Sequence, residues 1–340
     1  MANSTASALD DEGRGSCLSN VVNSRQDLLA GTAQVRRDMP LGKYMTQNWI
    51  LYIMLIPGLV NLLLFKYLPM YGVVVAFQNY SPAGGFFGSQ WVGFKHFAAF
   101  FRDPFCWRVI SNTFILGIQS LIISFPAPII FALMLNEIRA ERFKKTVQTI
   151  SYMPYFLSVV IVVGMMKELF SMTDGPVNAV LEMVGLERVN FFMRPDMFRP
   201  LYIGSGIWQG VGYGSIIYLA AIAGINPEMY ESAVLDGASR MQRIRYITLP
   251  SIMPTISVLF ILSVAGILGS DFQKILLMYN PRTYSTADVI STYVYRYGIE
   301  TAGNNLSYSS AVGLLVNVVS LLFLLIANYV TGKLGETSLF

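Results

Sequence analysis

Two groups of polar and aromatic side chains interrupt sequence that is otherwise apolar. They are, in one apolar run, Asp271, Gln273 and Lys274 and, in another, Trp208, Gln209, Gly210 and Tyr213. Charged groups inside an apolar run are costly to bury, so a binding or transport site is the default hypothesis for them. Asp271 and Lys274 are three residues apart, so on a helix they would also be able to pair with each other, or the lysine would reach an interface. These three interpretations stay open, and for Tyr213 ligand contact competes with ordinary packing.

A polar loop at 225–254 has the most informative pattern, INPEMYESAVLDGASRMQRIRYITLPSIMP. Asn226 followed by Pro227 predicts a helix start, with a polar cap and a proline at the first helical position. Gly237 should end that helix. A second short helix is predicted over 239–247, closed by the pair Leu249-Pro250. The loop is therefore expected to be a helix–turn–helix lying across the end of a bundle.

The elements that carry these groups are six long apolar runs. Hydrophobic residues make up 54% of the 340 residues and charged residues 13%, against about 25% charged residues in soluble domains. The mean hydropathy is +0.51. Each run is close to the roughly 20 residues that a membrane-spanning helix needs. The runs are 48–71, 112–135, 151–170, 200–224, 254–279 and 309–330. We therefore expect an all-α polytopic membrane protein with six spans. The glycines at spacing two in 204–214 predict either tight helix packing or a thin wall beside a ligand.

Basic residues in the loops predict the orientation of the spans. With six spans, three basic clusters fall on one side, which should be the cytoplasm: Arg25, Arg36, Arg37 and Lys43; Arg139, Arg142, Lys144 and Lys145; Arg240, Arg243 and Arg245. The opposite loops also carry basic residues, so the bias is moderate. Residues 1–43 read as a flexible cytoplasmic tail without a signal peptide, 44–335 as the membrane domain, and 336–340 as a short cytoplasmic end.

The loop at 225–254 resembles the EAA loop of bacterial ABC importer permeases. The positions that match the motif are Glu231, Ser232, Ala233, Asp236, Gly237, Ala238, Leu249 and Pro250. Ser232 replaces the first alanine of the family pattern, which is an exchange of one small residue for another. The competing interpretation is a generic amphipathic loop, but its place between two spans favours the motif. In that family the loop is the coupling helix that inserts into a groove of the ATPase subunit.

Two further segments, YGVVVAFQNY (71–80) and WVGFKHF (91–97), are similar to the carbohydrate-uptake permeases of the maltose type, and more narrowly to their oligosaccharide or polysaccharide members. The resemblance covers 43–340. It implies a type I ABC importer permease fold with six transmembrane helices in the bacterial inner membrane, with both termini in the cytoplasm. It also implies these partners: a second homologous permease, two ATPase subunits, an extracytoplasmic binding protein and a saccharide. The residues Trp208, Gln209, Gly210 and Tyr213 resemble the stretch that lines the sugar pocket in maltose-type permeases.

Enzymatic chemistry finds little support in the chain. The pair Gly332-Lys333 lacks a phosphate-cradling loop, so no Walker A motif is present, and no cofactor is expected in this chain. ATP and Mg²⁺ would be bound by the partner ATPase. A single histidine (His96) and two distant cysteines (Cys17 and Cys106) predict neither a metal site nor a catalytic set. The rivals are a secondary active transporter, which is disfavoured because no inverted repeat is visible, and an integral membrane enzyme.

Overall fold

The computed structural model describes residues 45–300 and 305–333 and divides the chain into two units, Met1–Tyr71 and Gly72–Phe340. In the first unit the apolar helix α3 (Trp49–Leu62) continues through a π turn (Leu63–Tyr67) into α4 (Leu68–Met70). Pro57 lies inside α3. The first predicted apolar run is thus helical.

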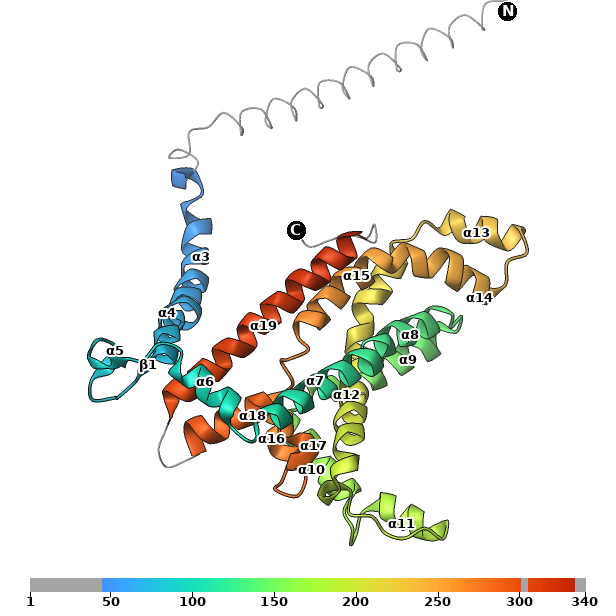
Figure 1. Cartoon of the computed structure of the whole chain (residues 1–340). Helices are drawn as coiled ribbons and strands as arrows, with labels where there is room; N and C mark the ends of the chain where they lie inside the picture. Colours follow the sequence, from blue (N-terminus) through green and yellow to red (C-terminus); the bar gives the residue numbers. More distant parts are fainter. Residues whose placement is uncertain (1–44, 301–304, 334–340) are drawn as a thin grey trace, which may run out of the picture. The chain divides into compact units, whose positions relative to one another are not determined.

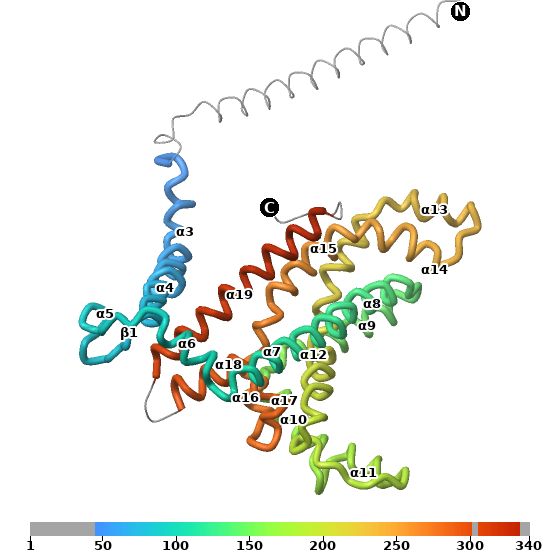
Figure 2. Tube along the Cα trace, viewed as in Figure 1, coloured from blue at the N-terminus to red at the C-terminus, as the bar shows by residue number. Residues whose placement is uncertain are grey.

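The second unit is an almost entirely helical bundle (Figures 1 and 2). Its longest helix is α12 (Pro195–Ala223), which contacts α7, α8, α9, α15 and α16. The elements that precede α12 are a 3-10 helix (Tyr71–Phe77), β1 (Gln78–Asn79), α5 (Gly85–Gly88), β2 (Gln90–Trp91), α6 (Lys95–Arg102), α7 (Cys106–Ser124), α8 (Pro126–Asn136), α9 (Glu141–Tyr152), a 3-10 helix (Met153–Phe156), α10 (Val159–Leu169), α11 (Pro176–Met183) and a 3-10 helix (Phe191–Met193). The elements that follow it are α13 (Pro227–Leu235), α14 (Arg240–Arg243), α15 (Leu249–Ala265), α16 (Phe272–Met278), α17 (Tyr284–Ala287), α18 (Ile290–Tyr295), a π turn (Arg296–Glu300) and α19 (Leu306–Lys333).

Three apolar clusters hold the second unit together. One packs α7, α10 and α16 against the first half of α12, and includes Leu116, Val163 and Ile275. A second joins α6 and α7 to α18 and α19 around Phe100 and Tyr293. The third joins α8 and α15 to the second half of α12. Strands β1 and β2 form a two-residue antiparallel hairpin, with Gln78 opposite Trp91.

Five described helices are long and apolar enough to cross a membrane: Trp49–Phe77, Cys106–Asn136, Pro195–Ala223, Arg240–Ala265 and Leu306–Lys333. A sixth span exists if Glu141–Phe156 and Val159–Leu169, which are bent by 102° across a short break, count as one. The all-α multi-span architecture predicted from hydropathy is therefore confirmed. The expectation of one continuous helix over 151–170 is wrong, because Leu157 and Ser158 are extended and interrupt it.

The fifth predicted run, 254–279, is also divided. Helix α15 ends at Ala265, the chain is irregular to Asp271, and the short helix α16 follows. The run was predicted as one span because most of its residues are apolar. Gly266 and Gly269 favour turns over a continuous helix at this point. Residues 1–44 and 334–340, which include both predicted tails, lie outside the described residues.

Candidate functional site

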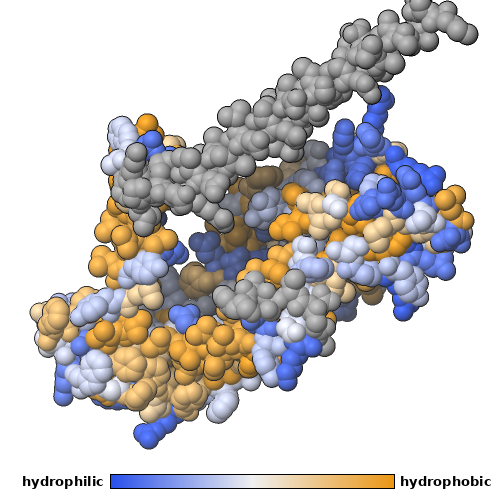
Figure 3. All heavy atoms as spheres, turned by 90° about the horizontal axis from the view of Figure 1, so that it is seen from above, coloured by the Kyte–Doolittle hydropathy of each residue, from blue (hydrophilic) through white to orange (hydrophobic). Residues whose placement is uncertain are grey.

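The loop between α12 and α15 begins with the helix that the sequence predicted. The Oδ1 atom of Asn226 accepts a hydrogen bond from the backbone N–H of Glu228 at 3.1 Å, and Pro227 occupies the first helical turn. Glu228 lies in that turn, where its charge favours the helix dipole. Every residue of α13 is exposed or half-buried, and Leu235 is 88% exposed. In the space-filling view, hydrophilic residues gather at the end of the molecule where α13 and α14 lie (Figure 3).

Gly237 ends α13 as predicted, in a left-handed conformation with φ +77°. The N–H of Gly237 donates to the carbonyl of Val234 at 3.0 Å, and that of Ala238 donates to Ala233 at 2.9 Å. This pair of bonds is the Schellman arrangement, which satisfies the last carbonyls of a helix. An added Cβ at Gly237 would meet open space, so the backbone angle and not crowding selects glycine here.

The second helix of the loop differs from the prediction. Ser239 caps it in a reciprocal box with Gln242, but the helix does not end at Leu249-Pro250. It runs on through a π turn, Ile244–Thr248, into α15. The N–H of Leu249 bonds to the carbonyl of Ile244, five residues back, and this wider turn accommodates the ring of Pro250 that would clash in a regular helix. Leu249 and Pro250 thus lie inside a continuous helix that joins the loop directly to a span.

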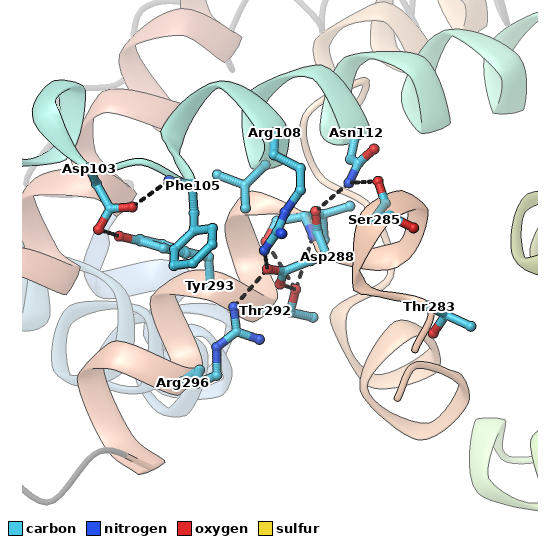
Figure 4. Close-up of polar contacts among 12 residues, drawn as sticks. Asp103, Phe105, Arg108, Asn112, Thr283, Ser285, Asp288, Thr292, Tyr293 and Arg296 are labelled. Carbon is cyan, nitrogen blue, oxygen red and sulfur yellow. Dashed lines mark hydrogen bonds and ion pairs between the residues drawn. The ribbon is translucent and has the colours of Figure 1, made fainter. Parts of the chain in front are cut away.

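A buried ionic network, which the sequence did not reveal, lies where α17 and α18 meet α7, away from α13 and α14 (Figure 1), and Figure 4 shows its residues. The side chain of Asp288 is 0% exposed. Its Oδ2 atom accepts hydrogen bonds from Arg296 at 2.7 Å and Arg108 at 3.5 Å, and its Oδ1 atom accepts from the hydroxyl of Thr292 at 3.0 Å. Burial alone would lower the pKa of Arg296, but the hydrogen bond and charge of Asp288 raise it.

Asn112 extends this network to α12. Its amide nitrogen donates to the carbonyls of Ser285 and Asp288 at 3.0 and 3.1 Å, and its Oδ1 atom accepts from Arg199 at 2.9 Å. Arg108 and Asn112 are four residues apart on α7, so both face the α17–α18 segment. The network therefore joins α7, α12 and α17–α18, and we call these residues (Arg108, Asn112, Arg199, Asp288, Thr292 and Arg296) the outer network.

A second polar contact lies beside the outer network. The hydroxyl of Tyr293 donates to Asp103 at 2.9 Å and lies 2.7 Å from the hydroxyl of Tyr308. Burial and these two hydrogen bonds raise the pKa of Tyr293 well above its usual range. The phenol is therefore a neutral structural group, and it ties α18 to the chain before α7 and to α19.

A cavity of about 440 Å³ lies between α7, α8, α12 and α15. Its wall is mostly apolar, and its polar groups include Ser120, Ser124, Tyr202, Ser263, Ser270 and Asp271. An apolar cavity with a few converging hydroxyl and carboxylate groups has the composition of a small-molecule site. Asp271 was predicted as a substrate residue, and it lies in this wall; the four serines and Tyr202 were missed, because isolated serines in an apolar run carry no distinctive spacing.

The remaining predicted substrate residues lie elsewhere. Trp208 lines a separate apolar pocket between α10 and α12. The amide of Gln209 donates to the carbonyl of Leu157 at 2.9 Å, at the break between α9 and α10. Tyr213 stacks on Tyr155, with ring centroids 3.8 Å apart and an interplanar angle of 6°. An added Cβ at Gly210 would meet nothing, and Gln273 is exposed.

The glycines of α12 fall into two kinds. Gly212 lets α12 lie close to α9, because an added Cβ would collide with the carbonyl of Ser151. An added Cβ at Gly214 would lie 3.2 Å from the ring of Pro128 on α8. Gly204 and Gly210 have open space where their Cβ atoms would be. Tight packing, one of the two alternatives for the glycine pattern, is therefore confirmed at Gly212 and Gly214, and a thin wall beside a ligand stays a prediction for Gly204 and Gly210.

Several long apolar helices, a capped and exposed loop between two of them, and a cavity inside the bundle define a multi-pass membrane transport subunit. Residues 124–335 match the family described as "Binding-protein-dependent transport system inner membrane component". The chain belongs to this family, and it is a permease subunit of a binding-protein-dependent ABC importer. Membership in this family contradicts the alternative of a secondary active transporter.

Individual relatives extend over most of the chain. Protein LplB of Bacillus subtilis (strain 168) is 43% identical over 85% of this chain and 91% of its own length. The polygalacturonan/rhamnogalacturonan transport system permease protein YteP of the same organism is 42% identical over 86% and 91%. A chain in the crystal structure of a bacterial alginate ABC transporter, in complex with an alginate pentasaccharide-bound periplasmic protein, superposes with a TM-score of 0.80 and 44% identity, covering 88% of this chain and 99% of that one.

Proposed function

We propose that this chain imports an oligosaccharide, as one of two homologous permease subunits that assemble with two ATPase subunits and an extracytoplasmic binding protein. The relatives support a saccharide, because their names refer to polygalacturonan or rhamnogalacturonan and to alginate. The ATPase subunits would bind ATP and Mg²⁺ and hydrolyse the nucleotide, and this chain would contribute no catalytic residue.

The observation that carries the proposal is the exposed, capped helix α13 in the loop between two spans. The residues assigned to ATPase coupling are Glu231, Ser232, Ala233, Asp236, Gly237, Ala238, Leu249 and Pro250. The carboxylate of Glu231 would pair with a basic residue of the ATPase subunit. The small side chains around the Gly237 turn would let that subunit approach the backbone closely. Because the loop continues without a stop into α15, a displacement of α14 would be transmitted along one helix to the membrane span.

The saccharide would pass along α12 and along the two helix breaks that contact it, one between α9 and α10 and the other between α15 and α16. Non-helical backbone at membrane depth is tolerated where it is buried in protein or lines a water-filled cavity. The break at Leu157 and Ser158 carries Tyr155 and Phe156, the latter 77% exposed. Aromatic rings such as these, together with Trp208 and Tyr213 on α12, would stack on the apolar faces of pyranose rings. The hydroxyl groups of the cavity wall and the carboxylate of Asp271 would bind the hydroxyl groups of the saccharide.

The orientation proposed is the one that the basic loops favour. Arg139, Arg142 and Lys145 lie near the junction of α8 and α9, at the end of the unit where α13 and α14 also lie (Figure 1). We place this end in the cytoplasm of a bacterium and the span-containing part, 44–335, in its inner membrane. Both termini, including the tail 1–43, would then be cytoplasmic.

The test is the ATPase activity of the purified complex in lipid, with and without the binding protein loaded with candidate saccharides, neutral and acidic. Stimulation by one loaded binding protein would support the importer function and identify the saccharide. A complex from gently solubilised membranes that contains no ATPase subunit would contradict the proposal.

The coupling assignment has its own variant, Gly237→Trp. A bulky residue at this left-handed turn should leave the bundle folded but reduce the amount of ATPase subunit that co-purifies, because the low docking surface is lost. Gly185→Trp is the matched control: Gly185 has φ +79° and also follows a helix end, after α11. If Gly237→Trp transports at the normal rate, the coupling assignment is wrong.

A further inference from the structure

The irregular segment between α15 and α16 lies deep in the membrane domain. An added Cβ on Gly117 would collide with the carbonyl of Ile267, so the two backbones touch. Gly117 is 11 residues beyond the start of α7, which places it roughly 17 Å along that helix at 1.5 Å per residue. Gly266, Ile267, Gly269 and Ser270 line the cavity. Exposed backbone at this depth requires neighbours that hold it in place.

Tyr202 on α12 meets the far end of this segment at two points. Its hydroxyl accepts a hydrogen bond from the backbone N–H of Asp271 at 3.0 Å. Its backbone carbonyl accepts from the Nζ atom of Lys274 at 3.0 Å. The Nζ atom also lies 5.0 Å from the centroid of the Tyr202 ring, a distance that favours an ammonium group over a neutral one. Tyr202 lines the cavity, so Lys274 lies directly behind the cavity wall.

The environment of Lys274 excludes the two simpler interpretations of its charge. The side chain does not reach the membrane–water interface, because the residue is buried in the protein and only 4% exposed. It is not ion-paired with Asp271 either: the Oδ1 atom of Asp271 accepts from the backbone N–H of Lys274 at 3.1 Å, and among the described residues no carboxylate lies within ion-pair distance of the Nζ atom. Gly206 lies next to the ammonium group, since an added Cβ there would be in ordinary contact with it at 3.5 Å.

We infer that Lys274 is a positioning residue for transport, which holds the irregular segment of the fifth span against α12 and thereby keeps the cavity wall closed at Tyr202 and Asp271. This inference rests on the proposed function, because the cavity is taken as part of the saccharide route. A buried charge without a carboxylate partner is costly, and a role in fixing two helices accounts for its presence at this depth.

The first experiment measures saccharide transported per ATP hydrolysed by the reconstituted complex for Lys274→Met, which keeps the length of the side chain but removes its donors. We expect this ratio to fall about tenfold, the factor that corresponds to losing about 1.4 kcal/mol from a charged hydrogen bond. ATPase stimulation by the binding protein should remain, because α16, which carries Lys274, packs against α10, α12 and α18. Lys274→Arg should restore the ratio, and Lys95→Met, at an exposed lysine on α6, should leave it unchanged. An unchanged ratio in Lys274→Met would overturn the inference.

A second experiment does not depend on transport. In a background without Cys17 and Cys106, Ser270→Cys reports how accessible the segment is to a water-soluble thiol reagent. Labelling should be faster when Lys274→Met is added, and equal labelling rates would overturn the inference even if the variant transports poorly. If the wild-type complex transports no saccharide while labelling still responds to Lys274→Met, the proposed function fails and the structural role of Lys274 stands.

Discussion

The outer network and the loop around α13 treat polar groups in opposite ways. In the outer network, Asp288 is fully buried, and its partners come from α7 as well as from its own segment. In the loop, the polar contacts are mostly local caps, such as Asn226 with Glu228 and Ser239 with Gln242. A hydrogen bond between the hydroxyls of Tyr230 and Thr248 links α13 to the following helix.

This difference separates a part of the molecule whose polar groups bond across several helices from a part whose helix is held by its own caps. Buried polar groups that satisfy one another rigidify a structure, whereas a capped helix with an exposed surface keeps its shape and leaves that surface free. We therefore expect the parts of α7, α12 and α18 that carry this network to move as one body during transport. In the proposed assembly, contact with the ATPase subunit should stabilise the loop.

The largest expected effect comes from Asp288→Asn. The substitution leaves Arg108 and Arg296 around a neutral amide, and breaking a buried ion pair costs about 3 kcal/mol or more of the free energy of unfolding. The thermal midpoint of the detergent-solubilised permease should fall accordingly. Asp196→Asn, which removes an exposed ion pair with Arg194, is the control and should leave the midpoint unchanged. Equal midpoints for the two variants would show that the outer network does not stabilise the fold.

A smaller and more local effect is expected from Asn226→Ala. Loss of the cap should destabilise α13 by about 1 kcal/mol, seen as about fivefold faster hydrogen exchange of its amides, without a change in the thermal midpoint. Ser158→Ala removes the corresponding cap of α10, whose apolar face is buried, and should lower the midpoint instead. If Asn226→Ala lowers the midpoint as much as Ser158→Ala, α13 is part of the same cooperative unit as the bundle.

The smallest effect concerns pH and is confined to the segment around His96. His96 is buried with its Nε2 atom 3.1 Å from the carbonyl of Gln78, and burial lowers its pKa below the usual 6.5. Because the folded state favours the neutral ring, this contribution is complete above pH 6.5 and is lost as the pH falls below that value. The protection of amides around 78–102, corrected for the slower intrinsic exchange at lower pH, should therefore fall between pH 7.5 and 5.5 in the wild type and change less in His96→Gln. The corrected protection of α13 should show no such difference between the two proteins. Equal pH dependence in both proteins would contradict this assignment.

Much of the architecture followed from the sequence because its causes are local. Apolar length predicted the spans, and the Asn-Pro and Gly signals placed both ends of α13 correctly. The same reasoning failed at Leu249-Pro250. A proline usually ends the helix before it, but here a π turn accommodates the proline and the helix continues. The basic residues in the loops opposite the basic clusters, which weakened the charge bias, include the arginines of the outer network. Their partner Asp288 lies in no sequence pattern that would predict its burial.

By itself, then, the sequence determined the class of the protein, its apolar spans and the loop that carries the family resemblance, since hydropathy, capping and a contiguous motif depend on neighbours in the chain. Tertiary structure decided where the third and fifth runs break and which polar groups are buried. Those breaks are stabilised by α12 side chains and backbone, through Gln209 at Leu157 and Tyr202 at Asp271 and Lys274, which are distant in sequence. Backbone groups freed inside a membrane need such partners, and only the folded chain brings them together.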